Sequence, residues 1–409
     1  MNTRRHLIQS LLAGAALAPF SAFTRLAVAA PAAGADSRFV FVMLRGGLDG
    51  LTAAPAIGDP AFASARGMLG DFKGFATPPL RLDDTFALHP LLPQVHAMHG
   101  RGEMSLLHAI GLPYRERSHF DAQQVLESGG ARPWEMKDGW LGRAVAASSG
   151  KGAGAPTGGL RAVALETAVP LVLRGPSDVD TWAPSVLPEP SADLVTRLAT
   201  VYRSDPELAQ ALQRARGLRD GTGLMADAAT KPEGAAANRN QTVTLATKAA
   251  EFLQRGSRIA VLDISGWDSH ANQGAPNAAL SNNLRTLDAA LAALRAGLLP
   301  NDAWKRTVVV VATEFGREVA VNGTAGTDHG SGGAAFVLGG AVRGGRVLAD
   351  WPGLAPAQRH EGRDLRVTTD LRAVFRTVLV DHLQLSARTV EQSVLPGSAA
   401  LPPMALLRG

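Results

Sequence analysis

Short runs of almost uninterrupted hydrophobic residues alternate along the chain with stretches whose hydrophobic residues recur every three or four positions. The first kind is typical of strands buried on both faces of a sheet, and the second of amphipathic helices. The runs predicted as strands are 39–44, 104–110, 161–166, 169–173, 258–264, 307–313 and 334–338. The pattern therefore predicts an α/β protein with a doubly wound, mostly parallel sheet and helices on both faces.

Helical spacing is clearest at 277–297, where one face carries Leu280, Leu284, Leu287, Leu291 and Leu294. Further helices are predicted at 89–98, 118–127, 139–149, 191–203, 205–218 and 370–383, with a long helix before residue 258. The stretch 219–237 is rich in Gly, Pro and small residues and is typical of a loop. We therefore expect a single α/β domain over residues 30–409, with a helical insertion at about 175–237.

The first 29 residues have the pattern of an export signal. Arg4 and Arg5 form a twin-arginine start, the hydrophobic stretch 11–20 follows, and residues 27–29 are typical of a cleavage site. The hydrophobic stretch is too short for a membrane span, although an uncleaved anchor helix is the alternative. We expect the twin-arginine translocase to export this protein in folded form to the periplasm or beyond, with no stable membrane span.

Composition narrows the classes of partner and ligand. The formal net charge of +5 includes three arginines of the first 29 residues, so it falls to +2 without them. No basic stripe with interleaved aromatic residues indicates nucleic-acid binding. The chain has no cysteine, which excludes disulfides and thiolate ligands. Any metal ion therefore depends on histidine, carboxylate or hydroxyl donors.

Acidic residues and histidines follow several predicted strands, at the point where each strand ends. The set is Asp49 after 39–44, Asp268 and His270 after 258–264, Glu314 after 307–313, and Asp328 and His329 in a Gly-rich turn before 334–338. Ligands of open α/β sheets bind outside the carboxyl ends of the strands. The oxygen and imidazole donors therefore predict one metal site built from distant parts of the chain.

Each of these residues also has a structural interpretation when taken alone. Asp49 lies among glycines, which is typical of a turn. Glu314 could pair with Arg317 near a helix start. His329 could be a turn histidine. The joint placement at strand ends favours the metal site, because such residues would otherwise scatter over both edges of the sheet.

Five motifs resemble those of a bacterial exported family known as domain of unknown function 1501. They are RGGLDG, RSHFDAQ, GWDSHANQ, ATEFGR and TDHGSGGAAFVLGG, and the resemblance spans roughly 38–385. That family resembles the alkaline phosphatase and sulfatase superfamily in fold. The resemblance implies an alkaline-phosphatase-like α/β domain and a divalent metal centre, while the reaction of the family is not established.

The superfamily resemblance implies roles for individual residues. Asp49 matches the metal-binding aspartate after the first strand, and Ser118 is the candidate nucleophile. A serine at a helix start lies beside free N–H groups that favour an anion, although it could simply cap the helix. One metal cluster would contain Asp49, Ser118 and Glu314. The second would contain Asp268, His270 and His329.

One departure from the superfamily pattern concerns the first cluster. Phe315 stands where the superfamily has a histidine after Glu314. His119 could replace the missing donor, or only one metal could bind, or only ligand binding could remain. The donor set admits Zn, Mn, Fe or Ca, with one or two ions.

The resulting hypothesis is an exported metal-dependent hydrolase of phosphate or sulfate esters, with a metal-activated Ser118 and a small anionic ester as substrate. Arg45 and Arg317 are candidates for binding the anion, although surface ion pairs are the common role of single arginines. The alternative is a non-catalytic exported protein that binds a metal or ligand. A Gly-x-Ser-x-Gly elbow and an H-E-x-x-H helix are both absent from the sequence.

Overall fold

The computed structural model describes residues 36–149, 159–184, 191–220 and 235–408. Residues Gly34–Gly409 form one compact unit by themselves. The predicted signal segment 1–29 and most of the predicted loop 219–237 lie outside the described residues. Within the described ranges, no helix combines the length and the apolar character needed to cross a bilayer.

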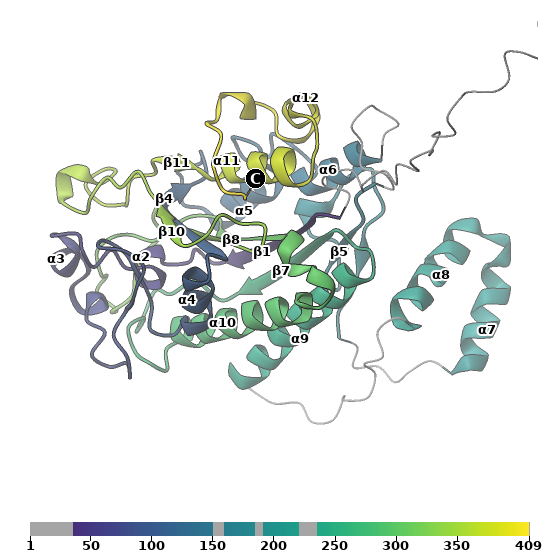
Figure 1. The fold of residues 1–409 in the computed structure, drawn as a ribbon, viewed down its shortest axis with the longest axis horizontal. Helices are drawn as coiled ribbons and strands as arrows, with labels where there is room; N and C mark the ends of the chain where they lie inside the picture. The colour runs from purple at the N-terminus through teal and green to yellow at the C-terminus, as the bar shows by residue number, and fades with distance from the viewer. Residues whose placement is uncertain (1–35, 150–158, 185–190, 221–234, 409) are drawn as a thin grey trace, which may run out of the picture. The chain divides into compact units, whose positions relative to one another are not determined.

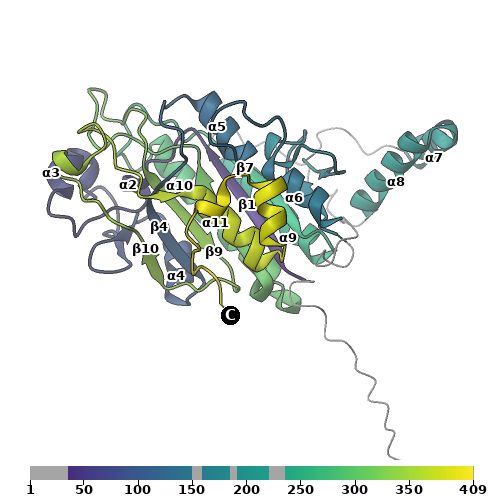
Figure 2. The same ribbon diagram turned by 90° about the horizontal axis from the view of Figure 1, so that it is seen from above.

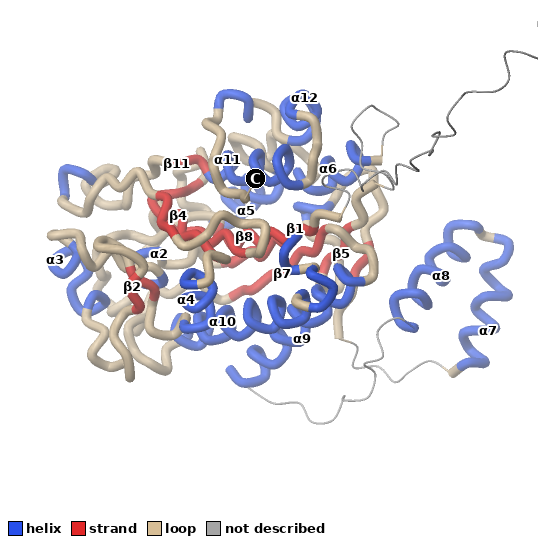
Figure 3. Tube along the Cα trace, viewed as in Figure 1, coloured by secondary structure: helices blue, strands red, loops and turns tan. Residues whose placement is uncertain are grey.

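A nine-stranded sheet lies at the centre of the fold (Figures 1 and 3). Its order is β10-β4-β9-β8-β1-β7-β5-β6, with β11 beside β4. Neighbouring strands run parallel except around β9, which is antiparallel to β4 and β8. The strands are β1 (Arg38–Arg45), β4 (Met104–Gly111), β5 (Ala162–Ala164), β6 (Asp180–Thr181), β7 (Ile259–Ser265), β8 (Thr307–Thr313), β9 (Gly333–Leu338), β10 (Arg346–Leu348) and β11 (Thr369–Asp370). A separate antiparallel pair joins β2 (Leu80–Arg81) and β3 (Ala87–Leu88).

The central strand β1 contributes to two hydrophobic cores, one on each face of the sheet. Val40 and Val42 belong to one core, whereas Phe41 and Met43 belong to the other. Successive side chains of a strand point to opposite faces. A continuous hydrophobic run is therefore what a strand covered on both sides requires.

Helices cover both faces, as Figures 1 and 2 show. The core that contains Val40 includes residues of α4, α9 and α10, and the core that contains Phe41 includes residues of α5, α6 and α11. The helices are α2 (Gly50–Ala53), α3 (Phe62–Arg66), α4 (Pro93–Gly100), α5 (His119–Ser128), α6 (Trp140–Ser148), α7 (Ala192–Val201), α8 (Pro206–Asp220), α9 (Ala235–Gln254), α10 (Ala279–Leu298), α11 (Leu371–Thr377) and α12 (Ala387–Thr389). The predicted α/β class, with its mostly parallel sheet and two helical layers, is confirmed.

Two predicted elements differ from the structure. The run 169–173 is not a strand, because Leu171–Leu173 form a 3-10 turn after Pro170. The Val172 N–H donates to the Glu127 carboxylate at 3.0 Å instead of to a neighbouring strand. The helix predicted at 370–383 is α-helical only over α11, Leu371–Thr377, and continues as a π-helical turn at Val378–His382. Helices α7 and α8 fall within 175–237, and the insertion itself stays a prediction.

The direction of the strands brings several loops to one edge of the sheet. The parallel strands β1, β4, β7 and β8 all end at this edge. Because β9 runs the other way, it begins at the same edge, and so does the Gly-rich turn before it. This edge is therefore where the loops after β7 and β4 and the turn before β9 can meet.

Candidate metal centre

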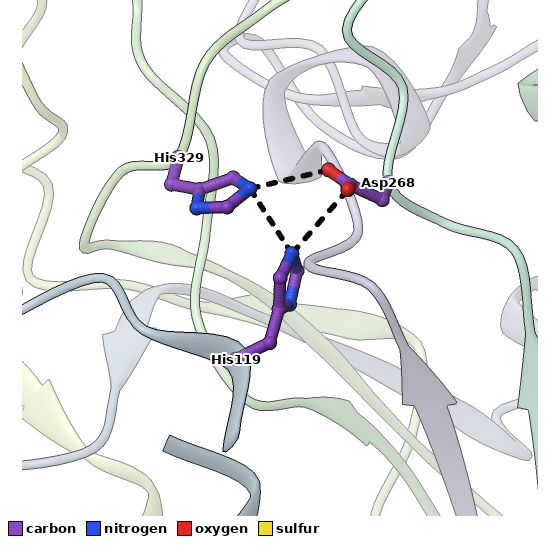
Figure 4. A group of neighbouring side chains, drawn as sticks. All are labelled: His119, Asp268 and His329. Atoms are coloured by element: carbon purple, nitrogen blue, oxygen red, sulfur yellow. Dashed lines mark hydrogen bonds and ion pairs between the residues drawn. The ribbon is translucent and has the colours of Figure 1, made fainter. Parts of the chain in front are cut away.

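Three side chains converge at this edge: His119, Asp268 and His329 (Figure 4). The Nε2 atoms of His119 and His329 lie 3.0 Å apart. Asp268 faces both, with Oδ1 3.2 Å from His329 Nε2 and Oδ2 3.5 Å from His119 Nε2. One donor atom from each residue lies within 4.8 Å of the others.

Each member comes from a different segment. His119 is the first residue of α5, which follows β4, and Asp268 lies three residues beyond the end of β7. His329 lies in the Gly-rich turn before β9, where a bridge pairs it with Arg317. The side chains of His119 and His329 are each 24% exposed and that of Asp268 is 43% exposed, so the centre is open to solvent.

His270 borders this group. Its Nε2 lies 2.9 Å from Asp268 Oδ1 and 3.1 Å from His329 Nε2. His119, Asp268 and His329 thus approach a common point, and His270 adjoins this group through His329 and Asp268. The structure brings together four of the six residues predicted as metal ligands, namely Asp268, His270, His329 and His119.

The other ring nitrogen of each histidine is committed to an acceptor. His119 Nδ1 lies 2.8 Å from Glu314 Oε1, and His270 Nδ1 lies 3.0 Å from Asp328 Oδ1. His329 Nδ1 lies 3.0 Å from the carbonyl oxygen of Arg117. Carboxylate and carbonyl oxygens only accept, so each Nδ1 carries the hydrogen and a neutral ring turns its Nε2 lone pair toward the common point. Metal-binding histidines are held in this way.

The spacing of these donor atoms fits a single cation. Two ligand atoms that are each about 2.1 Å from one ion lie roughly 3.0–3.4 Å apart at octahedral or tetrahedral angles. The Nε2 atoms of His119 and His329 lie 3.0 Å apart, and Asp268 Oδ1 lies 3.2 Å from that of His329. If the Nε2 atoms of His119 and His270 carried protons, both would donate to the Nε2 atom of His329. That atom has one lone pair and can accept only one well-aligned hydrogen bond. A shared cation removes this conflict.

Glu314 supports His119 and does not reach the common point itself. Its side chain is fully buried and its Oε1 accepts from His119 Nδ1, from the Gly46 N–H at 2.9 Å and from Gln123 Nε2 at 3.0 Å. Burial opposes ionisation, but these hydrogen bonds, that from His119 foremost, lower the pKa of Glu314. The hydrogen bond to Glu314 in turn raises the pKa of His119. Phe315 packs against the His119 and His329 rings, with centroids 4.7 and 5.0 Å away.

Asp49 is used elsewhere, although the sequence suggested it as a ligand. It caps α2, where its Oδ1 accepts from the Leu51 and Thr52 N–H groups at 3.0 and 3.1 Å. Its Oδ2 is bound by Arg66, Gln273 and the Thr52 hydroxyl. Burial opposes ionisation, but Arg66 and these hydrogen bonds lower the pKa of Asp49. The fully buried Arg66 therefore takes the place that the sequence assigned to a cation.

The two arginines expected to bind an anion are engaged in ion pairs. Arg317 is fully buried and its Nη1 donates to Asp268 Oδ1 at 2.6 Å, while its other donors reach Thr327. Arg317 therefore orients Asp268 and cannot contact a substrate from this position. Arg45 pairs with Asp263 and with Glu127, at 2.8 Å from the latter.

Ser118 occupies the N-cap position of α5, next to His119. Its side chain makes no hydrogen bond to the helix, so it does not act as the side-chain cap that the sequence allowed. It is half-buried and interacts with the Tyr114 hydroxyl. The nucleophilic role of Ser118 stays a prediction.

Several supporting residues were not predicted from the sequence. Asp364 is fully buried and accepts from Arg117, Arg363 and Ser331, each at 2.8 Å. Arg117 supplies the carbonyl that holds His329, and does so from a left-handed backbone with φ of 60°. The only sequence signal for this support was the basic Arg117 next to His119 in the RSHFDAQ motif. Its acceptor, Asp364, lies 247 positions away and could not be linked to it from the sequence.

Fold and side chains together define an α/β protein with a histidine–carboxylate centre at the carboxyl edge of its sheet. The chain belongs to the family described as "Protein of unknown function (DUF1501)", whose model matches residues 80–394. The family predicted from the motifs is therefore confirmed. No curated protein matches the chain.

Similar solved structures include two hydrolases and a synthase. The PsFucS1 sulfatase from Pseudoalteromonas sp. is 12% identical, with a TM-score of 0.43 over 87% of this chain and 69% of that one. The phosphonate monoester hydrolase of Agrobacterium radiobacter is 12% identical, with a TM-score of 0.37 over 85% and 74%. The lipoteichoic acid synthase LtaP from Listeria monocytogenes is 11% identical, with a TM-score of 0.33 over 78% and 68%. These likenesses are too weak to transfer a residue role to this chain.

Proposed function

We propose that this protein is an exported metal-dependent hydrolase of phosphate or sulfate esters that uses one divalent cation. The observation that supports it is that the donor atoms of His119, His329 and Asp268 lie close enough together to bind one ion. The Nδ1–H of each of the two histidines is held by an acceptor. His270 completes the donor set from the side of Asp268. Imidazole ligands suit Zn or Fe, whereas Ca and Mn prefer oxygen ligands, so the donor set favours the first two.

A cation held here supplies Lewis acidity and positive charge beside the ester oxygens. The chain's own residues would hold and orient the reactants. Arg317 and Glu314 fix the directions of Asp268 and His119 from the protein interior. Ser118 is the proposed nucleophile, because it directly precedes His119 and its hydroxyl does not cap the helix. The Asp49 cluster that the superfamily resemblance implied is replaced by an Arg66 ion pair, which favours one cation over two.

The experiment combines metal analysis with an ester screen. Purified protein is stripped with a chelator, reloaded with Zn, Mn, Fe or Ca, and assayed with 4-nitrophenyl phosphate and 4-nitrophenyl sulfate. Asp268→Asn should lose bound metal and hydrolysis together. His96→Ala is the matched control, since His96 lies on α4 and its ring bonds the Arg81 carbonyl and no other group of the described residues. Full metal content in Asp268→Asn would refute the proposed centre.

Ser118→Ala separates the nucleophile from the metal. Metal content should stay at the wild-type level, while hydrolysis falls by at least on the order of 10³-fold, as for other nucleophile deletions. Unchanged hydrolysis would remove Ser118 from the reaction. Wild-type protein that binds metal but turns over neither ester class would favour the alternative, an exported binding protein that keeps the fold.

A further inference from the structure

Five arginines are grouped around the start of β4, at the edge of the sheet opposite the metal centre. We call them the arginine surface: Arg101, Arg295, Arg343, Arg346 and Arg408. Arg101 lies three residues before β4, and Arg346 begins β10, where it pairs in parallel with Ser105 near the start of β4. Because β4 ends at the edge that carries His119, these residues lie at the other edge.

Hydrogen bonds to the backbone hold the segments of this surface together. Arg408 donates from Nη2 to the Gly102 carbonyl at 2.7 Å and from Nε to the Val342 carbonyl at 3.0 Å. Arg346 Nε donates to the Arg343 carbonyl at 2.9 Å. Burial and the nearby charge of Arg343 lower the pKa of Arg346. Carbonyl acceptors orient these guanidinium groups but leave their positive charge in place.

Among the described residues, a single carboxylate bonds any of these five guanidinium groups. Glu103, which is 15% exposed, accepts from Arg295 at 2.8 and 3.0 Å and from Arg101 at 2.9 Å. Arg343 is exposed, and its guanidinium group bonds none of the described residues. Five positive charges against one negative leave an excess of four, whereas the whole chain after residue 29 has a formal excess of two. Positive charge is therefore concentrated at this edge.

We propose that the arginine surface docks the exported protein on an anionic phospholipid membrane, with the metal centre facing away from the bilayer. Guanidinium groups pair well with phosphate oxygens, and a cluster of basic residues is attracted to anionic lipid headgroups. The arginines come from four separate segments, which suits an extended layer of phosphates. The exposed aromatic residues Phe120 and Trp134 lie on other segments, so no side chain that could stack on nucleic-acid bases accompanies them. The proposal is independent of the proposed hydrolase function.

The charge of Arg343 offers the sharpest test, because its removal breaks no hydrogen bond to the described residues. Each basic side chain near an anionic membrane increases binding by roughly 5-fold. Arg343→Glu changes two charges and should therefore weaken binding by about 30-fold. Arg343→Lys keeps the charge and should bind like the wild type. Binding of all forms should fall as salt is raised, because the Debye length is only about 10 Å at 0.1 M.

The experiment is sedimentation with vesicles of phosphatidylcholine containing about one third phosphatidylglycerol, compared with vesicles of phosphatidylcholine alone. The full chain is used throughout, so the first 29 residues contribute equally to every form. Arg366→Glu is the matched control. Arg366 is exposed, its side chain bonds the Gln358 carbonyl at 3.1 Å, and the preceding Leu365 carbonyl accepts from the Gly332 N–H at the metal-bearing edge. Arg366→Glu should bind the anionic vesicles like the wild type.

Three results would overturn the docking surface. The first is wild-type protein that binds both kinds of vesicle equally at low salt. The second is equal weakening by Arg343→Glu and Arg366→Glu, which would reflect overall charge. The third is displacement by glycerol 3-phosphate beyond that caused by sodium chloride of equal ionic strength, which would indicate a site for one soluble anion. Metal content of Arg343→Glu should match the wild type, so that loss of docking and loss of the metal centre remain distinguishable.

Discussion

Substitution of Asp49 by Asn tests whether this residue belongs to the interior of the fold or to the metal centre. Asn keeps the size of the side chain and an acceptor for the N-terminus of α2. It removes the charge opposite Arg66, whose side chain is 0% exposed. Removing one partner of a buried ion pair costs about 3–5 kcal/mol, because the remaining charge stays buried without compensation. A domain of ordinary stability has only about 5–15 kcal/mol in total.

The assay separates stability from metal binding. Urea unfolding of chelator-treated protein gives the free energy of unfolding, and elemental analysis gives the metal content of the folded fraction. We expect Asp49→Asn to lose about 3–5 kcal/mol and to keep its metal. His329→Ala should show the reverse pattern, with metal lost and little change in the metal-free stability. An Asp49→Asn protein with wild-type stability and no metal would refute the reasoning and restore Asp49 as a ligand.

Three further predictions concern the support of the centre and a distant carboxyl. Glu314→Gln should weaken metal binding about 10- to 100-fold without abolishing it, measured by competition with a chelator, because Glu314 acts through an imidazole; complete loss would make it a direct ligand. Gly46→Ala should lower metal content, since its Cβ would lie 2.5 Å from the Asp268 nitrogen, whereas Gly67→Ala meets nothing within 4 Å and should retain the metal. Burial raises the pKa of Asp288 from 3.8 to about 6, so the folded state binds the proton of this carboxyl more tightly than the unfolded state does. Protonated Asp288 therefore contributes to the free energy of unfolding at low pH, and this contribution is lost as pH rises through about 6. Between pH 4 and 7 the wild type should lose about 2 kcal/mol relative to Asp288→Asn in urea unfolding, and parallel profiles would contradict this.

The strands were predictable because each is a short hydrophobic run whose local pattern has one interpretation. The predicted 39–44, 258–264 and 307–313 match β1, β7 and β8 within one residue at either end. The run 169–173 was mispredicted because Pro170 and a side-chain acceptor, Glu127, favour a turn there. Such an acceptor comes from a distant helix and leaves no signal in the run itself.

The location of the candidate site was predictable from the sequence, but which of its residues face the metal was not. Asp268, His270 and His329 meet because strand direction brings their loops to one edge. Asp49 and Glu314 also follow strands there, but a strand end does not tell whether a carboxylate will face a cation, an arginine or a histidine. That choice depends on contacts between distant positions, such as the hydrogen bond between His119 and Glu314, which lie 195 positions apart.

The centre joins parts of the chain that are far apart, and this has a consequence for durability. His119 and His329 are 210 positions apart, and the chain has no cysteine with which to make a covalent cross-link. With the proposed cation in place, the coordination bonds form a reversible cross-link that closes a very long loop of the chain. Metal binding of this kind stabilises the native state by about 2.7 kcal/mol when free metal is at 100 times its dissociation constant. Resistance of this protein to heat and to proteolysis should therefore follow the supply of metal in its surroundings.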